Sequence, residues 1–85
     1  MKQITYSKDA LRTLQKMQPP IAKRIREKIS LYASAPGSLT NNVITLQGID
    51  PVAYRLRVGD WRVIFTDDGE VVAIIRVAPR GSAYD

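Results

Sequence analysis

The sequence predicts an α+β fold of two layers, in which two helices cover one face of a mainly antiparallel sheet of about four strands. A strand-like segment comes first, two helical segments follow, and the remaining segments have the alternation of strands. Each helical segment has one apolar stripe, and Tyr54–Phe65 is typical of a β-hairpin. With 85 residues, of which 45% are hydrophobic and 25% charged, we expect one domain spanning residues 1–85.

The N-terminal segment predicts a strand followed directly by a helix. Lys2–Tyr6 alternates between apolar and polar residues, as a strand with one buried face does. Ser7 is well suited to cap the helix that follows, because its hydroxyl can accept a hydrogen bond from a free backbone amide of the first turn. The helix is expected over Lys8–Met17, with an apolar stripe of Leu11, Leu14 and Met17.

Two prolines separate this helix from a second one. Pro19 and Pro20 end the first helix, since proline cannot continue it, and Pro20 also suits the start of the next helix. The second helix is expected to run to about Ala35, before Pro36-Gly37-Ser38 ends it. Its apolar stripe consists of Ile21, Ile25, Ile29 and Ala33.

The outer face of the second helix is rich in cations. Lys23 and Arg26 on this face are candidates to contact the backbone of a nucleic acid. A charged outer face is, however, more often simply solvated, and the pattern does not decide between these two interpretations.

The region between the helices and the hairpin has the weakest pattern. Leu39–Pro51 is expected to contain a short strand at most, with Ile49 partly buried. After the hairpin, Thr66–Gly69 predicts a second turn. Val71–Val77 is apolar at nearly every position, which predicts a strand buried on both faces.

The hairpin Tyr54–Phe65 sorts its side chains onto two faces with different chemistry. A two-residue turn at Gly59-Asp60 sets the register. It places Val58 opposite Trp61, Arg57 opposite Arg62, Leu56 opposite Val63, Arg55 opposite Ile64 and Tyr54 opposite Phe65. Residues directly opposite share a face. One face is therefore apolar, with Tyr54, Leu56, Val58, Trp61, Val63 and Phe65, and we expect the helices to cover it.

The other face of the hairpin carries Arg55, Arg57 and Arg62. Two cations directly opposite each other are unfavourable unless something anionic compensates for them. One interpretation is a surface cluster neutralised by nearby acidic side chains, for which Asp60, Asp67 and Glu70 are the candidates. We favour binding of phosphate or carboxylate, since exposed ion pairs stabilise a fold only weakly.

Composition excludes several classes of function. The chain has no cysteine and no histidine, so disulfides, thiolate catalysis and histidine acid–base catalysis are excluded, and we expect neither a metal site nor a cofactor. No apolar run approaches the roughly 20 residues of a membrane span, and the N-terminus lacks the apolar core of a signal peptide. We therefore expect a cytoplasmic protein that does not contact membranes.

The kinds of cation point to a polyanionic partner. The formal net charge is +5, which by itself also suits a merely soluble basic protein. The five lysines all lie in the first third of the chain, whereas the cations after residue 50 are all arginines. The planar guanidinium of arginine matches phosphate oxygens in a way that the ammonium of lysine does not, which favours phosphate recognition by the C-terminal half.

Taken together, these segments resemble the RelE/ParE superfamily of bacterial and archaeal toxins. The resemblance covers nearly the whole chain. It rests on the helix pair, on Leu46-x-Gly48, on the hairpin from Tyr54 to Phe65, and on Arg76-Val-x-x-Arg80-x-x-x-Tyr84. Such toxins belong to type II toxin–antitoxin modules. The resemblance implies a cognate antitoxin that wraps and neutralises the toxin, a hetero-oligomeric complex, and a free toxin that is monomeric.

The superfamily divides by target. RelE-like members cleave mRNA codons in the ribosomal A site, whereas ParE-like members inhibit DNA gyrase. The C-terminal arginine and tyrosine are more similar to the RelE branch, which implies that ribosome and mRNA are partners. A decayed toxin that only binds its antitoxin remains a further alternative.

On the RelE interpretation, the RNA supplies its own nucleophile, because its 2′-OH attacks the adjacent phosphorus. The resemblance implies a catalytic set of Arg57, Arg62, Arg80 and Tyr84. Tyr84 would act as a base or stack on a nucleobase, and its alternative is a frayed tail held by an aromatic ring. RNA-binding candidates are Arg55, Arg57 and Arg76 on the strands, with Lys23 and Arg26 on the second helix.

Overall fold

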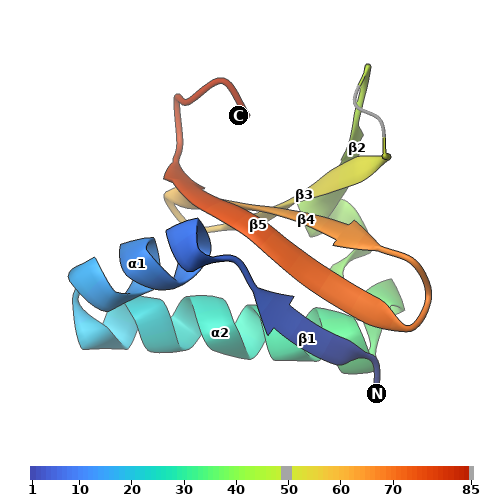
Figure 1. The fold of residues 1–85 in the computed structure, drawn as a ribbon, viewed down its shortest axis with the longest axis horizontal. Helices are drawn as coiled ribbons and strands as arrows, with labels where there is room; N and C mark the ends of the chain where they lie inside the picture. Colours follow the sequence, from blue (N-terminus) through green and yellow to red (C-terminus); the bar gives the residue numbers. More distant parts are fainter. Residues whose placement is uncertain (49–50, 85) are drawn as a thin grey trace.

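The computed structural model describes residues 1–48 and 51–84, so Ile49 lies outside the described residues. The elements in chain order are β1 (Gln3–Tyr6), α1 (Lys8–Lys16), α2 (Pro19–Ser34), the 3₁₀ helix η1 (Pro36–Asn42), β2 (Val43–Leu46), β3 (Ala53–Val58), β4 (Trp61–Asp67) and β5 (Val71–Pro79). They form two layers, with α1 and α2 on one side of the sheet (Figure 1). The predicted α+β fold is confirmed.

The described strands form one sheet in the order β1-β5-β4-β3-β2. Neighbours pair antiparallel except β1 and β5, which run parallel, so the first and last strands of the chain lie side by side. The sheet therefore has five strands rather than about four. The additional strand is β2, for which the sequence gives little signal because Val43–Leu46 is short and its apolar residues do not alternate.

Local sequence signals explain the helix boundaries. Ser7 caps α1 as predicted, and its Oγ accepts a hydrogen bond from the Ala10 amide at 3.0 Å. Pro19 and Pro20 occupy the first two positions of α2, where the missing amide hydrogens cost nothing. Ile21 differs from the prediction, because it is 37% exposed at the start of α2, whereas Ile25 and Ile29 are buried.

The hairpin register is confirmed at every predicted pair, from Val58 opposite Trp61 to Tyr54 opposite Phe65. Its apolar face packs against the helix layer and supplies much of the core. Phe65 is fully buried with Tyr32 of α2 and Tyr54 of β3 against its ring, at centroid distances of 4.7 and 5.5 Å. Other fully buried side chains are Leu14, Ile25, Ile29, Leu56, Val63, Val72 and Ile74.

Strand β5 departs from the predicted central strand buried on both faces. Ile64 pairs with Arg76 while Phe65 pairs with Ile74, so Ile75 is the extra residue of a β-bulge. As a result Ile75 is 44% exposed and Arg76 is also exposed. The helix layer covers only one face of the sheet. After the bulge, the side chain of Val77 again faces that layer and is buried.

Candidate functional site

The face of the sheet that points away from the helices carries four arginines, which we call the arginine face. They come from three adjacent strands and comprise Arg55 and Arg57 of β3, Arg62 of β4 and Arg76 of β5. Arg57 lies directly opposite Arg62, and Arg76 lies opposite Ile64, the second residue after Arg62. Residues opposite or diagonal to each other have Cβ atoms within about 5–8 Å, so the four arginines start from neighbouring positions on one face.

Arg62 is almost covered, with only 8% of its surface exposed. Its Nη1 donates hydrogen bonds to the carbonyl oxygens of Gly59, at 3.0 Å, and of Trp61, at 3.1 Å. The hairpin turn therefore fixes the guanidinium in place through its own backbone. These two bonds hold the guanidinium of Arg62 in a defined position beside the arginine face.

Arg57 and Arg55 differ from Arg62 in their partners. Arg57 is exposed, and its side chain forms no ion pair or hydrogen bond with residues 1–48 or 51–84. Arg55 is half-buried between Ile44 and Ile64, and its Nε is buried without an acceptor in the same ranges. Such unpaired donors are available to an anion that approaches the face.

The acidic residues that were candidates to neutralise this cluster lie away from it or contact other cations. Asp60 lies 3.5 Å from Arg80, and Asp67 lies 2.7 Å from Lys2. Glu70 lies in the exposed turn before β5. Among the described residues, these acids therefore leave Arg55 and Arg57 uncompensated.

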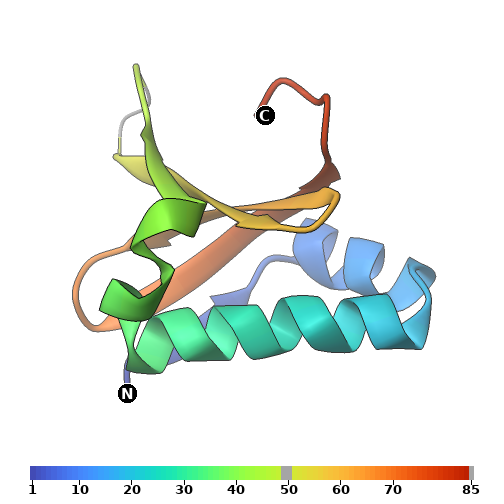
Figure 2. The same ribbon diagram turned by 180° about the vertical axis from the view of Figure 1, so that it is seen from behind.

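The C-terminal tail bends back over the same side of the sheet (Figures 1 and 2). Arg80 begins the tail, and its amide donates to the Asp60 carbonyl at 2.7 Å, which ties it to the hairpin turn. Gly81 has φ of 82°, a conformation that favours glycine and turns the chain. Tyr84 is half-buried, and its ring centroid lies 5.6 Å from the guanidinium carbon of Arg76.

Arg76 has a second partner that no pattern in the sequence indicates. Its Nε lies 4.0 Å from Oδ2 of Asp9, in the first turn of α1. In the sequence, Asp9 looks like an ordinary acidic residue at a helix N-terminus, where it complements the helix dipole. Only the pairing of β1 with β5 brings it near the arginine face, and no local pattern predicts that pairing.

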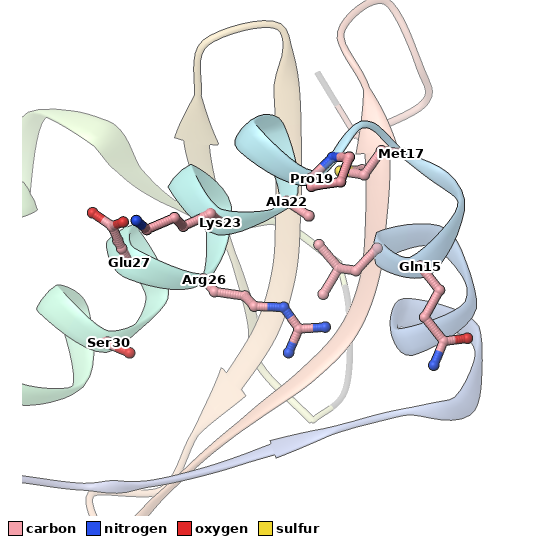
Figure 3. Close-up of a pocket in the computed structure, with 9 residues that line it drawn as sticks. Gln15, Met17, Pro19, Ala22, Lys23, Arg26, Glu27 and Ser30 are labelled. Atoms are coloured by element: carbon pink, nitrogen blue, oxygen red, sulfur yellow. The ribbon is translucent and has the colours of Figure 1, made fainter.

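Lys23 and Arg26 are not brought to this face, because they lie on α2 in the other layer. Both line a groove of about 590 Å³ between α1 and α2 (Figure 3). Its other lining residues are Leu14, Gln15, Met17, Pro19, Ala22, Glu27 and Ser30. Arg26 also lies over the ring of Tyr6, 5.5 Å from its centroid. Burial raises the pKa of Tyr6, and the positive charge of Arg26 partly opposes this.

The described residues contain no cluster of three or more acidic side chains arranged to hold a metal ion. No helix in residues 1–48 or 51–84 is long and apolar enough to cross a membrane. The side chains that the described sheet face and tail bring together are guanidinium groups and one phenol.

This combination of fold and site defines a small α+β protein whose open sheet face presents cations beside an aromatic tail. Over residues 4–84 the sequence matches the family described as the ParE toxin of the type II toxin–antitoxin system parDE. Because this match covers nearly the whole chain, the protein belongs to that family, within the RelE/ParE superfamily of toxins.

Solved structures of related toxins share the fold. The archaeal RelE–RelB complex from Pyrococcus horikoshii contains a chain that is 28% identical, with a TM-score of 0.78 over 96% of this chain and 98% of that one. The RelB–RelE complex of Methanococcus jannaschii contains a chain that is 26% identical, with a TM-score of 0.67 over 95% of each chain. YafQ from Escherichia coli is 13% identical with a TM-score of 0.76 over both full chains, which shows the fold alone. A comparison with curated protein sequences finds no match.

Proposed function

We propose that this toxin, acting as a single domain, cleaves mRNA on the ribosome in the cytoplasm by promoting attack of a 2′-OH on the adjacent phosphorus. The observation that carries this proposal is the arginine face, whose Arg57 and Arg55 lack described partners and lie beside a tail bearing Arg80 and Tyr84. The likeness to RelE structures supports the same reaction class.

The reaction needs charge stabilisation and alignment more than it needs acid–base groups. A bond forms between the 2′-oxygen and phosphorus, and the bond from phosphorus to the 5′-oxygen breaks, which leaves a 2′,3′-cyclic phosphate and a 5′-OH. Arg57 contacts the non-bridging oxygens, and Arg62 adds a fixed positive charge beneath them. Because Arg62 is already held by the turn, little reorganisation accompanies the build-up of negative charge.

The tail supplies the remaining groups. Arg80 is exposed and stabilises the leaving 5′-oxygen, after release from its weak solvent-exposed pair with Asp60. Tyr84 has two chemical roles open to it, since its phenol oxygen can accept the 2′ proton and its ring can stack on a base. Replacement of Tyr84 by Phe separates them, because stacking survives that change and proton transfer does not.

The test is to map RNA 5′ ends after brief expression of the chain without an antitoxin. The expected result is new ends within translated codons, reduced about a hundredfold in Arg57→Ala and in Arg80→Ala. Arg12→Ala is the matched control, because Arg12 is an exposed arginine on α1 and should leave the pattern intact. Arrest of growth with intact mRNA would overturn the proposal, as would full cleavage by both variants.

A second candidate function is inhibition of DNA gyrase, which the match to the ParE family favours. In this case expression would cause DNA damage and filamentation while bulk mRNA stays intact. The same RNA mapping therefore separates the two functions.

We also propose that an antitoxin neutralises the chain in a hetero-oligomeric complex and that the free toxin is monomeric. The Pyrococcus and Methanococcus structures are complexes of RelE with RelB. The groove in Figure 3 offers an apolar floor with Lys23 and Arg26 beside it, which suits an acidic amphipathic segment. Because these two cations lie on the helix layer, we do not assign them to the RNA site.

A further inference from the structure

The tail that carries Tyr84 is joined to the rest of the fold at Arg80 and at Tyr84. Its first residue is bonded to the hairpin turn, because the Arg80 amide donates to the Asp60 carbonyl at 2.7 Å. Two further hydrogen bonds lie within this segment, from the Ser82 amide to the Pro79 carbonyl and from the Tyr84 amide to Ser82 Oγ, each at 3.3 Å. Further along the tail, the Tyr84 ring contacts Arg76 of β5, at 5.6 Å from ring centroid to guanidinium carbon.

The position of Arg76 follows from the bulge in β5. The extra residue Ile75 restarts the alternation of the strand, so that Arg76 pairs with Ile64 on the arginine face. The carbonyl of Ile75 accepts a hydrogen bond from Ser7 Oγ at 2.6 Å, which holds the first turn of α1 against the bulge. This junction brings Asp9 to within 4.0 Å of Arg76 Nε.

Arg76 therefore differs from Arg57, although both belong to the arginine face. A carboxylate lies against the guanidinium of Arg76, and an aromatic ring lies within cation–π distance of it. Arg57 is exposed and has no side-chain partner among the described residues. Arg76 is thus already in contact with α1 and with the tail, whereas Arg57 can donate to a phosphate directly.

We propose that Arg76 is a positioning residue, which holds the Tyr84 ring over the arginine face and is itself oriented by Asp9. The inference deepens the proposed function, because it assumes that Tyr84 serves the cleavage reaction. On this proposal Arg76 is not a direct RNA contact. Asp9 of α1 affects the site by orienting Arg76.

The kinetic test is a double-mutant cycle on RNA cleavage by the free toxin with ribosomes and mRNA. Arg76→Gln is expected to lower the cleavage rate about threefold to tenfold in the native background, from loss of an exposed cation–π contact. In a Tyr84→Ala background it should have almost no further effect. Equal factors in both backgrounds would show that Arg76 acts without Tyr84 and would overturn the proposal.

Further variants separate positioning from a general structural effect. Arg76→Lys should recover part of the rate, because it keeps a cation beside the ring, and Asp9→Asn should show a weaker loss in the same direction. Arg12→Gln, which removes an exposed arginine from the same helix, should have no effect.

A spectroscopic readout is independent of cleavage. The ring resonances of Tyr84, assigned by their loss in Tyr84→Leu, should move towards those of a free tyrosine in Arg76→Gln and stay unchanged in Arg12→Gln. Unchanged resonances in Arg76→Gln would overturn the proposal that Arg76 positions the Tyr84 ring, even in a toxin that cleaves RNA. Conversely, absence of cleavage by the native toxin, together with the expected shift, would count against the proposed function and support the positioning of Tyr84 by Arg76.

Discussion

Asp67 is a nearly buried carboxylate that joins three parts of the fold. Its side chain is 9% exposed and accepts hydrogen bonds from Lys2 Nζ at 2.7 Å, Tyr32 OH at 2.8 Å and the Gly69 amide at 2.9 Å. These donors lie before β1, on α2 and in the β4–β5 turn. Burial raises the pKa of Asp67, but the three hydrogen bonds outweigh it and the pKa is lowered. Burial and the hydrogen bond to Asp67 raise the pKa of Tyr32.

The lowered pKa of Asp67 predicts a loss of stability in acid. A carboxylate with a depressed folded-state pKa contributes stability above its unfolded value of about 3.9, and the contribution disappears as the pH falls through the folded value. Asp67→Asn should lower the free energy of unfolding at pH 7 by about 1–3 kcal/mol. In this variant the free energy of unfolding, measured with urea, should also fall less steeply as the pH drops below about 4. A fall as steep as that of the native chain would contradict this, and Glu27→Gln on the exposed face of α2 is the control.

At the scale of elements, the β3–β4 hairpin is built on one special backbone conformation. Gly59 has φ of 57°, and no described residue other than glycine has a positive φ. A positive φ confined to the first turn residue is typical of a type II′ turn, whose twist matches that of the strands. The turn also orients Arg62, since the Gly59 carbonyl accepts one of its hydrogen bonds.

Gly59→Ala should therefore destabilise the fold by about 1–2 kcal/mol, the cost of a left-handed conformation for a residue with a Cβ. The cost is conformational, because the nearest atom to the added Cβ would be Arg24 Nη1 at 3.9 Å, an ordinary contact. Gly37→Ala is the matched control, with open space around the Cβ, and should change stability by less than about 0.5 kcal/mol. Thermal unfolding of both variants gives the comparison, and equal shifts would contradict the assignment of the turn.

The elements that local patterns predict well are those whose signals lie within a few residues. The hairpin register, the Ser7 cap and the proline start of α2 each depend on short-range chemistry, and each is confirmed. The parallel pairing of β1 with β5 joins residues almost seventy positions apart in sequence, and the β5 bulge depends on that assembled sheet. For the same reason the hairpin pattern predicts that Arg55, Arg57 and Arg62 share a face, but it does not predict the burial of Arg62 or the proximity of Asp9 to Arg76.

The whole molecule has two cationic surfaces on opposite layers. The arginine face and tail form one, and the groove between α1 and α2 with Lys23 and Arg26 forms the other (Figures 1 and 3). Patterns of charge along the sequence do not distinguish these two surfaces, because both are basic. The fold places them on different layers (Figure 1).

Salt dependence distinguishes these surfaces. Each phosphate contact on single-stranded RNA changes the slope of log affinity against log salt by about 0.7. For binding of a short RNA, Arg57→Gln should therefore make the slope less steep by about that amount, whereas Lys23→Gln on the other layer should leave it unchanged. Titration of a fluorescent oligonucleotide at several salt concentrations measures both slopes, and the reverse result would move the RNA site to the helices.

The neighbouring positions of β1 and β5 have a consequence for synthesis of the chain. As a nascent polypeptide leaves the ribosome, the β3–β4 hairpin can form once residues up to Asp67 have emerged. Strand β1 has no neighbour until Val71–Pro79 has also left the exit channel, because β5 lies between it and the rest of the sheet. The tail that bears Tyr84 emerges later still. A chain whose β5 is still inside the exit channel therefore lacks the completed sheet, and Tyr84 cannot yet lie against Arg76.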